Sequence, residues 1–558
     1  MNEETSMNTK LKSPEFVVDK LKKYFTKERK KIILLTFVFG IITHFLLLSN
    51  LIMSQDGLFM GVHYTAGSYE TALGRWGINI FDSLRNNIAL PFVTTLISIF
   101  IMSFINILII ELLEIKNKIF EFFTILTVVA SPGLCMTLLY VYTADVYIFA
   151  MLFSIFSVYS LYKIKSKKLG ITLSIICFIL TLSIYQSYMG ITIGLILIVS
   201  VKDLLEQKYS AVEILRIIII NALIVILSAI LYWLLTKIIL SISGIEMAGY
   251  GGLSHISIST IFATLIPSIK TAYISFIKYF FADGIILNRS WKRDKMYLFF
   301  FVLFALCMLV ICIRKIKNKD NKKEFFKNYI LSCLIIILLP IALNLVIILA
   351  PGNDIYYLTS TQMMLMFPFM FTIFELIVEK DIISNLLNWG ISIISSLILF
   401  TYIMCCIVTY QTLELSYSQA KNIANRVLEK MEIFEEYNPE MPVMFAGVVS
   451  DSNFVKTLDL YDFAINNSLR SSIFHGTYHG QQGTWKKFYN IFLGHHFYFC
   501  EDYQYYHIVN SGEFKEMRVF PEKNSVRIID GVMVVKFTDE PELPPWSQNM
   551  MEHGITPY

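Results

Sequence analysis

Charged residues are scarce in this sequence. Asp, Glu, Lys and Arg make up 16% of its 558 residues, against about one quarter in a soluble domain. Hydrophobic residues make up 55%. This composition excludes an ordinary soluble protein and predicts a multi-pass protein embedded in a lipid bilayer. The net charge is only +4 and the basic residues gather in short loops, which indicates membrane topology signals and no nucleic-acid partner.

Several chemical motifs are absent as well. The sequence has no Cys-x-x-Cys pair and no His/Cys spacing typical of a zinc site, so we expect neither a disulfide framework nor a metal site of that kind. A glycine-rich nucleotide loop is missing, so a nucleotide-sugar donor is not supported. No internal repeat of the kind found in many transporters is present. We expect no cofactor, and the sequence leaves open whether a divalent metal is required.

The order of basic and apolar segments predicts a topology. Residues 1–31 are polar and lysine-rich, and no small-residue cleavage site follows the apolar stretch after them. We therefore expect a basic N-terminus in the cytoplasm and a retained first helix over 32–53. A helical hairpin with its tip at Tyr185–Tyr188 is predicted in 169–201, and an amphipathic helix in the membrane interface over 256–281. Further spans are predicted at about 88–111, 119–141, 145–162, 214–239, 329–350, 362–378 and 387–410, with one more after the basic cluster 289–295.

Residues 32–410 would thus form a domain of about eleven membrane helices. A soluble tail is predicted at 411–558, on the outer side of the membrane because the number of spans is odd. In this tail, residues 415–436 predict a helix, 442–447 a buried strand and 525–537 a hairpin that turns at Asp530-Gly531. The expected fold class is therefore mainly α, a polytopic membrane protein with a small extracytoplasmic α/β tail domain.

Two acids are predicted on the outer side of the membrane. Asp56 follows the first span, and Asp145 follows the short turn between the third and fourth spans. The loop that holds Asp56 also holds Glu70, Arg75 and Arg85. An acid and a guanidinium in one loop can bind and activate a phosphorylated, hydroxyl-bearing substrate. Two simpler interpretations stay open, namely that both acids only cap helices and that Arg75 reaches lipid head groups.

Several short motifs follow one another in a characteristic order. They are Asp56 after the first helix, Gly74-Arg75-Trp76, Ser131-Pro132, Asp145 after a tyrosine-rich turn, Ile184-Tyr185-Gln186 and, in the tail, the segments 442–447, 528–531 and 534–536. In this order the chain resembles the bacterial Gtr-type O-antigen glucosyl transferases over nearly its whole length. The resemblance implies a polytopic enzyme of GT-C-like architecture in the cytoplasmic membrane of a bacterium.

The resemblance also implies roles for individual residues. Asp56 matches the catalytic carboxylate of the first outer loop, and Asp145 the acid of the second. Arg75 is the expected contact of the donor phosphate, with Arg85 and Arg293 as alternatives. The other candidate substrate-binding residues are Glu70, Trp76, Tyr185 and Gln186. The aromatic rings among them would stack on a sugar, whereas the glutamine has the alternative of bonding a neighbouring helix.

Enzymes of this kind move a sugar, typically glucose, from an undecaprenyl-phosphate carrier to a surface glycan outside the cytoplasmic membrane. We therefore expect an undecaprenyl-phosphate-sugar donor and an acceptor of the O-antigen or cell-wall polysaccharide type. A lipid-phosphosugar synthase and a flippase would act upstream. Two alternatives remain open: a lipid-linked glycan flippase or transporter, which would carry its polar residues at the membrane midplane, and a polysaccharide polymerase or ligase.

Overall fold

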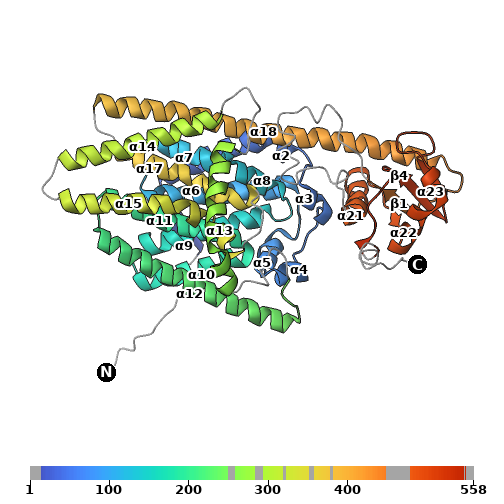
Figure 1. The fold of residues 1–558 in the computed structure, drawn as a ribbon, viewed down its shortest axis with the longest axis horizontal. Helices are drawn as coiled ribbons and strands as arrows, with labels where there is room; N and C mark the ends of the chain where they lie inside the picture. The colour runs from blue at the N-terminus through green and yellow to red at the C-terminus, as the bar shows by residue number, and fades with distance from the viewer. Residues whose placement is uncertain are drawn as a thin grey trace.

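The computed structural model describes residues 14–248, 258–282, 293–317, 322–350, 357–377, 381–447, 478–545 and 547. Figure 1 shows a bundle of long helices with a small domain beyond one of its ends, formed by the C-terminal part of the chain. We call the end of the bundle nearest this domain the tail end and the opposite one the far end. The predicted fold class, mainly α with a small α/β tail, is confirmed.

Each long helix follows a hydrophobic run that ends at a cap or a helix breaker. Thr26 precedes α2, and its side chain accepts a hydrogen bond from the backbone N–H of Arg29. Pro132 divides the third predicted span into α7 and α8, because proline has no N–H with which to continue the hydrogen-bond ladder. The first helices are α1 (Pro14–Tyr24), α2 (Lys27–Ser49), α6 (Pro91–Leu113), α7 (Lys118–Ala130), α8 (Pro132–Leu139) and α9 (Ala144–Lys163). They are followed by α10 (Lys167–Ile184), α11 (Met189–Leu205), α12 (Ala211–Ser243), α14 (Arg293–Lys317), α15 (Lys322–Leu343) and α16 (Leu345–Leu349).

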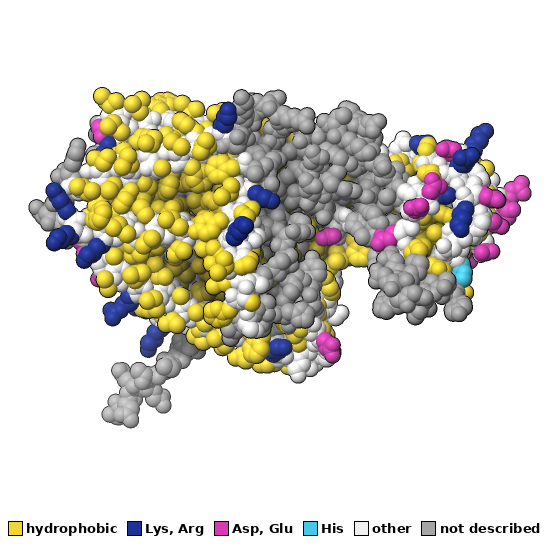
Figure 2. All heavy atoms as spheres, in the orientation of Figure 1, with side chains coloured by type: hydrophobic (Ala, Val, Ile, Leu, Met, Phe, Trp, Pro, Cys, Tyr) yellow, Lys and Arg dark blue, Asp and Glu magenta, His cyan; other side chains and the backbone are white. Residues whose placement is uncertain are grey.

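Eleven helical stretches among the described residues are long and apolar enough to cross a membrane. Figure 2 shows hydrophobic side chains over the bundle, with Lys and Arg gathered at the far end and charged residues of both signs on the tail. An apolar belt between two polar ends is the surface that a bilayer requires. The chain is a multi-pass membrane protein.

The segment α13 (Ile258–Ile277) has the length and composition to cross a membrane, but it is oriented differently from its neighbours. In Figure 1 it runs across the direction of α14 and α15. Asn344, directly after α15, donates a hydrogen bond to the carbonyl of Ala272 at 3.1 Å. Helix α13 therefore lies across the tail end of α15, an orientation that agrees with the interfacial helix predicted over 256–281.

The span predicted at 362–378 is a mixed helix. Here η5 (Tyr357–Leu365), a 3₁₀ helix of 9 residues, continues into α17 (Met366–Glu375) with 10. At about 2.0 and 1.5 Å per residue the two reach about 33 Å, which is enough to cross a bilayer. Glu375 accepts hydrogen bonds from the backbone N–H groups of Lys116 and Asn117, at 2.8 and 2.7 Å, in the loop between α6 and α7. This segment crosses the bundle as predicted. Its apolar composition predicts a span but does not predict that the first half is a 3₁₀ helix.

The helical hairpin predicted in 169–201 is present. Helix α10 stops at Tyr185, whose backbone is extended, and η2 (Gln186–Tyr188) leads into α11. Gly77 donates its backbone N–H to the carbonyl of Ser183 at 2.8 Å. The tip of the hairpin therefore lies against the loop that follows α2.

Ion pairs join the helices at the far end. Glu114 accepts from Lys163 at 2.5 Å and from Lys202 at 2.8 Å. Arg29 pairs with Glu111 at 2.6 Å. The basic residues predicted on the cytoplasmic side thus meet acids of neighbouring helices, which cross-links this end of the bundle.

One helix connects the bundle with the tail. Helix α18 (Ile382–Glu432) has 51 residues and unites the span predicted at 387–410 with the tail helix predicted at 415–436. The division between domains at residue 411 therefore falls inside a continuous helix and remains a prediction.

The tail contains a four-stranded sheet in the order β2-β1-β4-β3. β1 runs parallel to both of its neighbours, and β3 and β4 form an antiparallel hairpin. Asp530 and Gly531 make its turn with φ of 50° and 73°, the left-handed conformation that an Asp-Gly pair favours. The predicted strand and hairpin are confirmed. The strands are β1 (Pro442–Ala446), β2 (Tyr498–Phe499), β3 (Val526–Ile529) and β4 (Val532–Lys536), and the helices around them are α21 (Tyr478–Phe488), α22 (Asp502–Asn510) and α23 (Gly512–Glu516).

The tail lies at the same end of the bundle as the loop of Asp56. Helix α21 contacts α3 (Gln55–Met60), the short helix that holds Asp56. Trp485 of α21 is fully buried, with its ring stacked on Phe537 at 5.1 Å and on Phe445 at 4.8 Å between centroids. Because α21 is fixed to the sheet on one side and touches α3 on the other, the tail and the first loop share one side of the membrane.

This arrangement predicts a labelling pattern. In a variant without native cysteines, Ser68→Cys in the first loop and Lys523→Cys in the tail should both react with a membrane-impermeant thiol reagent on intact cells. Lys165→Cys at the far end should react only after the membrane is opened. Labelling of Lys165→Cys alone on intact cells would invert the predicted topology, and reaction of only one of the other two would contradict the structure.

Candidate active site at the tail end of the bundle

The loop between α2 and α6 contains several short helices. Ser54 caps α3, since its Oγ accepts a hydrogen bond from the backbone N–H of Gly57 at 3.2 Å. The N–H of Ser54 donates to the carbonyl of Leu139 at 2.8 Å. This bond places Asp56, in the first turn of α3, beside the turn that leads from α8 into α9. The other short helices of the loop are α4 (Ser68–Ala72), α5 (Ile78–Asp82) and η1 (Ser83–Arg85).

Asp56 is exposed, whereas the other acids of this loop, Glu70 and Asp82, are half-buried and buried. The protein around it nevertheless limits its hydration, and this desolvation raises the pKa of Asp56 above its usual 3.8. Burial raises the pKa of Tyr142 well above 10, and the negative charge of Asp56 adds to that shift. The carboxylate therefore lies close to the tyrosine-rich turn before α9. A carboxylate that is accessible and more basic than usual is suited to accept a proton.

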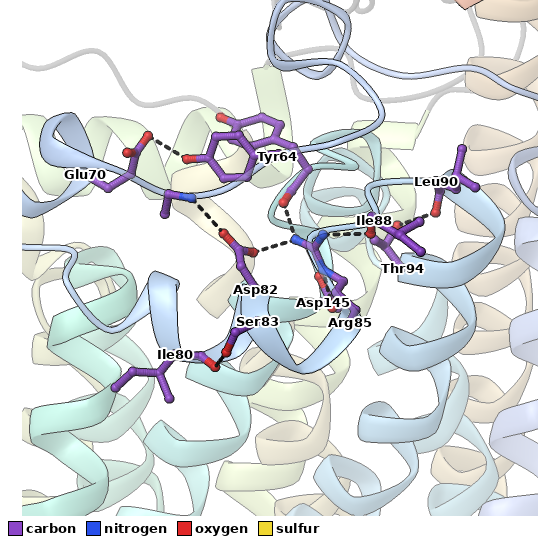
Figure 3. Close-up of polar contacts among 12 residues, drawn as sticks. Tyr64, Glu70, Ile80, Asp82, Ser83, Arg85, Ile88, Leu90, Thr94 and Asp145 are labelled. Atoms are coloured by element: carbon purple, nitrogen blue, oxygen red, sulfur yellow. Dashed lines mark hydrogen bonds and ion pairs between the residues drawn. The ribbon is translucent and has the colours of Figure 1, made fainter.

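A buried ion triad connects this loop with the start of α9 (Figure 3). Arg85 donates from Nη2 to Asp82 Oδ1 at 2.6 Å and from Nε to Asp145 Oδ2 at 3.1 Å. It also donates to the carbonyl of Ile88 at 2.7 Å and to that of Tyr142. All three charged side chains are at most 4% exposed. The guanidinium thus binds a carboxylate that lies 60 positions further along the sequence.

The two carboxylates of the triad differ in their surroundings. Burial raises the pKa of Asp82 to about 7, against the opposing effect of Arg85, and its Oδ2 accepts the backbone N–H of Ala66 at 3.2 Å. Oδ1 of Asp145 is buried and accepts no hydrogen bond from the described residues, although the N-terminal turn of α9 favours a negative charge there. The single guanidinium faces two carboxyl groups. The raised pKa of Asp82 favours its neutral form, which reduces the net negative charge buried in the triad.

Glu70 is hydrogen-bonded to Tyr64, an aromatic residue of the same loop. Its Oε1 accepts a hydrogen bond from the hydroxyl of Tyr64 at 2.6 Å, and its Oε2 one from the N–H of Gly67 at 2.7 Å. The rings of Tyr64 and Tyr142 meet edge to face, with centroids 4.8 Å apart. Both oxygens of Glu70 are therefore used in shaping the loop.

A second polar group surrounds Arg75. Its Nε donates to Oε1 of Gln186 at 3.3 Å, and its guanidinium lies 5.3 Å from the centroid of the Tyr185 ring. The amide nitrogen of Gln186 donates to the carbonyl of Leu73 at 3.0 Å and to Tyr232 at 3.1 Å. Arg75 itself is half-buried. The hairpin tip thus orients this guanidinium at the end of the bundle.

An aromatic stack connects the two groups. The rings of Tyr147 and Tyr185 are stacked with centroids 4.5 Å apart. Tyr147 follows Asp145 by two residues in the sequence, and Tyr185 contacts Arg75. Trp76, next to Arg75, donates its indole N–H to Thr236 at 3.1 Å. Asp56, the triad and Arg75 therefore belong to one region of loops at the tail end.

A family model described as glucosyl transferase GtrII matches residues 48–373. The chain belongs to this family. The match begins at the end of α2 and takes in the loop of Asp56, the ion triad and the hairpin tip. No curated protein and no solved structure matches the chain. The resemblance found in the sequence is confirmed, and with it the general activity of a glycosyltransferase.

The structure brings together most of the residues that the sequence proposed for a GtrII site. Asp56 and Asp145 lie at the same end, as predicted, and Arg75 contacts Tyr185 and Gln186. Arg85 has a different environment from the one expected of a phosphate ligand, because its donors face two carboxylates and two carbonyls. The side chain of Arg293, at the start of α14, lies outside the described residues. Within the described part of the chain, no three His, Cys, Asp or Glu side chains are grouped as metal ligands would be.

Some residues of the region were not selected from the sequence. Asp82 precedes Arg85 by three residues, a spacing typical of a local ion pair, and this was the available signal. Tyr232 of α12 gave no signal, since it is one aromatic residue in a long apolar helix. Its hydroxyl donates to the carbonyl of Gly74 at 3.0 Å and so fixes the residue next to Arg75.

The triad predicts a large effect of Arg85 on stability. Arg85→Met leaves two buried carboxylates without a counter-charge, and removal of one partner of a buried pair costs about 3 to 5 kcal/mol. We expect a strongly lowered unfolding temperature and a poor yield of folded protein. Arg75→Met, at a half-buried position, is the matched control and should lower stability little. If Arg85→Met folded normally and lost only affinity for a phosphorylated lipid, Arg85 would be a ligand rather than part of the fold.

Proposed function

We propose that this GtrII-family protein transfers a glucosyl group from undecaprenyl phosphate to a cell-surface polysaccharide, on the outer face of the cytoplasmic membrane. The observation that carries the proposal is that one loop at one end of the bundle holds both a solvent-accessible carboxylate, Asp56, and the cation Arg75. Lys and Arg side chains gather at the other end, which supports a cytoplasmic position for that end (Figure 2).

The chemistry assigns a distinct role to each group. A hydroxyl oxygen of the acceptor attacks the anomeric carbon of the donor, and its proton passes to the Asp56 carboxylate. The bond between the anomeric carbon and the lipid phosphate breaks, and the phosphate leaves with the electron pair. Arg75 stabilises the charge on that phosphate, because a guanidinium offers paired N–H donors. Trp76, which is half-buried, supplies an aromatic face for the sugar. Tyr185 does not fit the predicted stacking on a sugar, because it is buried and its ring contacts Tyr147 and Arg75.

Asp56 is a better candidate for the base than Asp145. Asp145 is 3% exposed and ion-paired with Arg85, so proton acceptance there would disturb a buried pair. Asp56 reaches solvent and, in the described part of the chain, forms no ion pair. Asp145 instead joins the start of α9 to the loop between α2 and α6, through its ion pair with Arg85.

A flippase or transporter is less well supported. Such a protein opens alternately to both sides of the membrane, and its binding site lies near the midplane. Here the polar groups gather in loops at the tail end, while Glu114, Lys163, Lys202, Arg29 and Glu111 form ion pairs that join helices at the far end. This asymmetry favours an enzyme that works from one side.

Substitution of Asp56 tests the proposed base. Asp56→Asn keeps the shape of the side chain but removes the proton acceptor, so turnover should fall by about two to four orders of magnitude. Folding and donor affinity should change little at this accessible position. The measurement is glucosyl transfer per folded molecule from undecaprenyl-phosphate-glucose, with donor affinity measured alongside.

Two further variants separate the roles within the same assay. Arg75→Ala should weaken donor binding as well as turnover, because the phosphate is charged before and after transfer. Asp145→Asn should have the smaller effect on turnover per folded molecule. Near-normal turnover of Asp56→Asn together with an inactive Asp145→Asn would assign the base to Asp145. Transfer from a nucleotide sugar without any lipid carrier would contradict the proposed donor.

The pH dependence gives an independent check. Asp56 accepts a proton only when it is ionised, and desolvation raises its pKa above 3.8. Turnover should therefore fall as the pH drops through this raised pKa, so that the acid limb of the pH profile lies above the range of an exposed aspartate. Asp56→Asn should abolish this limb in the residual activity. An unchanged acid limb in that variant would assign the titration to another group.

A further inference from the structure

Tyr417 lies where α18 leaves the bundle and enters the tail. It is 2% exposed, and its hydroxyl donates a hydrogen bond to the carbonyl of Met53 at 3.1 Å. Met53 directly precedes Ser54, the capping residue of α3. A side chain that is 364 positions further along the sequence therefore bonds to the backbone just ahead of the Asp56 helix.

Helix α3 depends on such contacts for its position. It has 6 residues, far fewer than an isolated helix needs to be stable in water. At its start, the side chain of Ser54 caps it, the N–H of Ser54 bonds to Leu139, and the carbonyl of Met53 bonds to Tyr417. Asp56 follows this anchored start by two residues, so a shift of the anchor moves the carboxylate.

The ring of Tyr417 packs against the tail. Its centroid lies 5.1 Å from that of Phe492 and 6.2 Å from that of Phe488, the last residue of α21. The backbone of α21 also approaches α3 closely, because a Cβ built on Gly483 would lie 2.8 Å from Cε2 of Phe59. Phe59 follows Asp56 by three residues, on the same side of α3. The tail thus contacts α3 at its start through Tyr417 and along its side through Gly483.

We propose that Tyr417 is a positioning residue for Asp56, and that the tail acts with the bundle as one catalytic unit by holding α3 in place. This inference rests on the proposed function, in which Asp56 is the base. It gives the tail a direct role in turnover, through the geometry of the carboxylate, and none in binding the lipid donor, whose proposed contact is Arg75 of the bundle.

The test compares two isosteric variants. Tyr417→Phe removes the hydroxyl bonded to Met53 and leaves the ring in place. The matched control is Tyr489→Phe: Tyr489 is equally buried, and its hydroxyl donates to the carbonyl of Ala424 at 2.9 Å, which also joins the tail to α18 but does not touch the Asp56 loop. Both variants lose one buried hydrogen bond to a backbone carbonyl, so both should lower the unfolding temperature to a similar extent.

Turnover should distinguish the two variants. Tyr417→Phe should lower kcat per folded molecule about two- to tenfold, the range that one hydrogen bond of ordinary strength supplies, with the KM for undecaprenyl-phosphate-glucose unchanged. Tyr489→Phe should keep the kcat of the wild type. Equal kcat values for both variants and the wild type would overturn the proposal, as would a change confined to KM.

A second pair of variants tests the lateral contact. Gly483→Ala brings a methyl group against Phe59 and should lower kcat in the same way. Gly512→Ala at the start of α23 is its control, because a Cβ there meets nothing within 4 Å. Normal kcat in both Gly483→Ala and Tyr417→Phe would leave the tail without a role in turnover. If the wild type itself transfers nothing from the lipid donor, the proposed function fails instead, and the two failures remain distinguishable.

Discussion

A buried guanidinium between two carboxylates is the interaction on which the tail end of the bundle depends. Arg85 bonds to Asp82 in its own loop and to Asp145 at the first turn of α9. It also bonds to the carbonyl of Ile88, in the loop before α6, and to that of Tyr142, in the turn before α9. Because a charge in such a place is stable only with all of its partners, the triad permits essentially one arrangement of these segments. The triad thereby fixes the segments that carry the accessible groups around it, Asp56 and Arg75.

The helical framework could be predicted because it follows from local physics. Runs of apolar residues of bilayer length predict spans, and the lysines at their ends indicate which side each loop occupies. The hairpin tip at Tyr185 and the Asp530-Gly531 turn were predicted for the same reason, since each depends on a few neighbouring residues. The family was recognised from the order of short motifs, and the match over residues 48–373 confirms it.

The remaining features depend on contacts between distant residues. From the sequence, Arg85 was a candidate phosphate ligand. The residues next to it in the sequence do not show that its Nε lies 3.1 Å from Oδ2 of Asp145. Two predicted helices at 387–410 and 415–436 form one helix, since the residues between them are compatible with a helix in water as well as in lipid. In the sequence, nothing distinguishes Tyr417 from other aromatic residues, and only the structure shows the hydrogen bond from its hydroxyl to the carbonyl of Met53. For the site, the sequence predicted which loops take part, whereas the partners of each side chain needed the structure.

The length of α18 has a mechanical consequence. At about 1.5 Å per residue its 51 residues extend for about 76 Å, of which a bilayer core accounts for about 30 Å. After Gly390 the helix contains neither glycine nor proline, the residues at which helices most often bend. The tail is therefore connected to the bundle by a continuous helix without a flexible joint, and it does not move independently of the bundle. When a thinner or thicker membrane tilts this helix, the tail and the loops that it contacts tilt with it, so the height of the candidate active site above the membrane depends on the thickness of the bilayer.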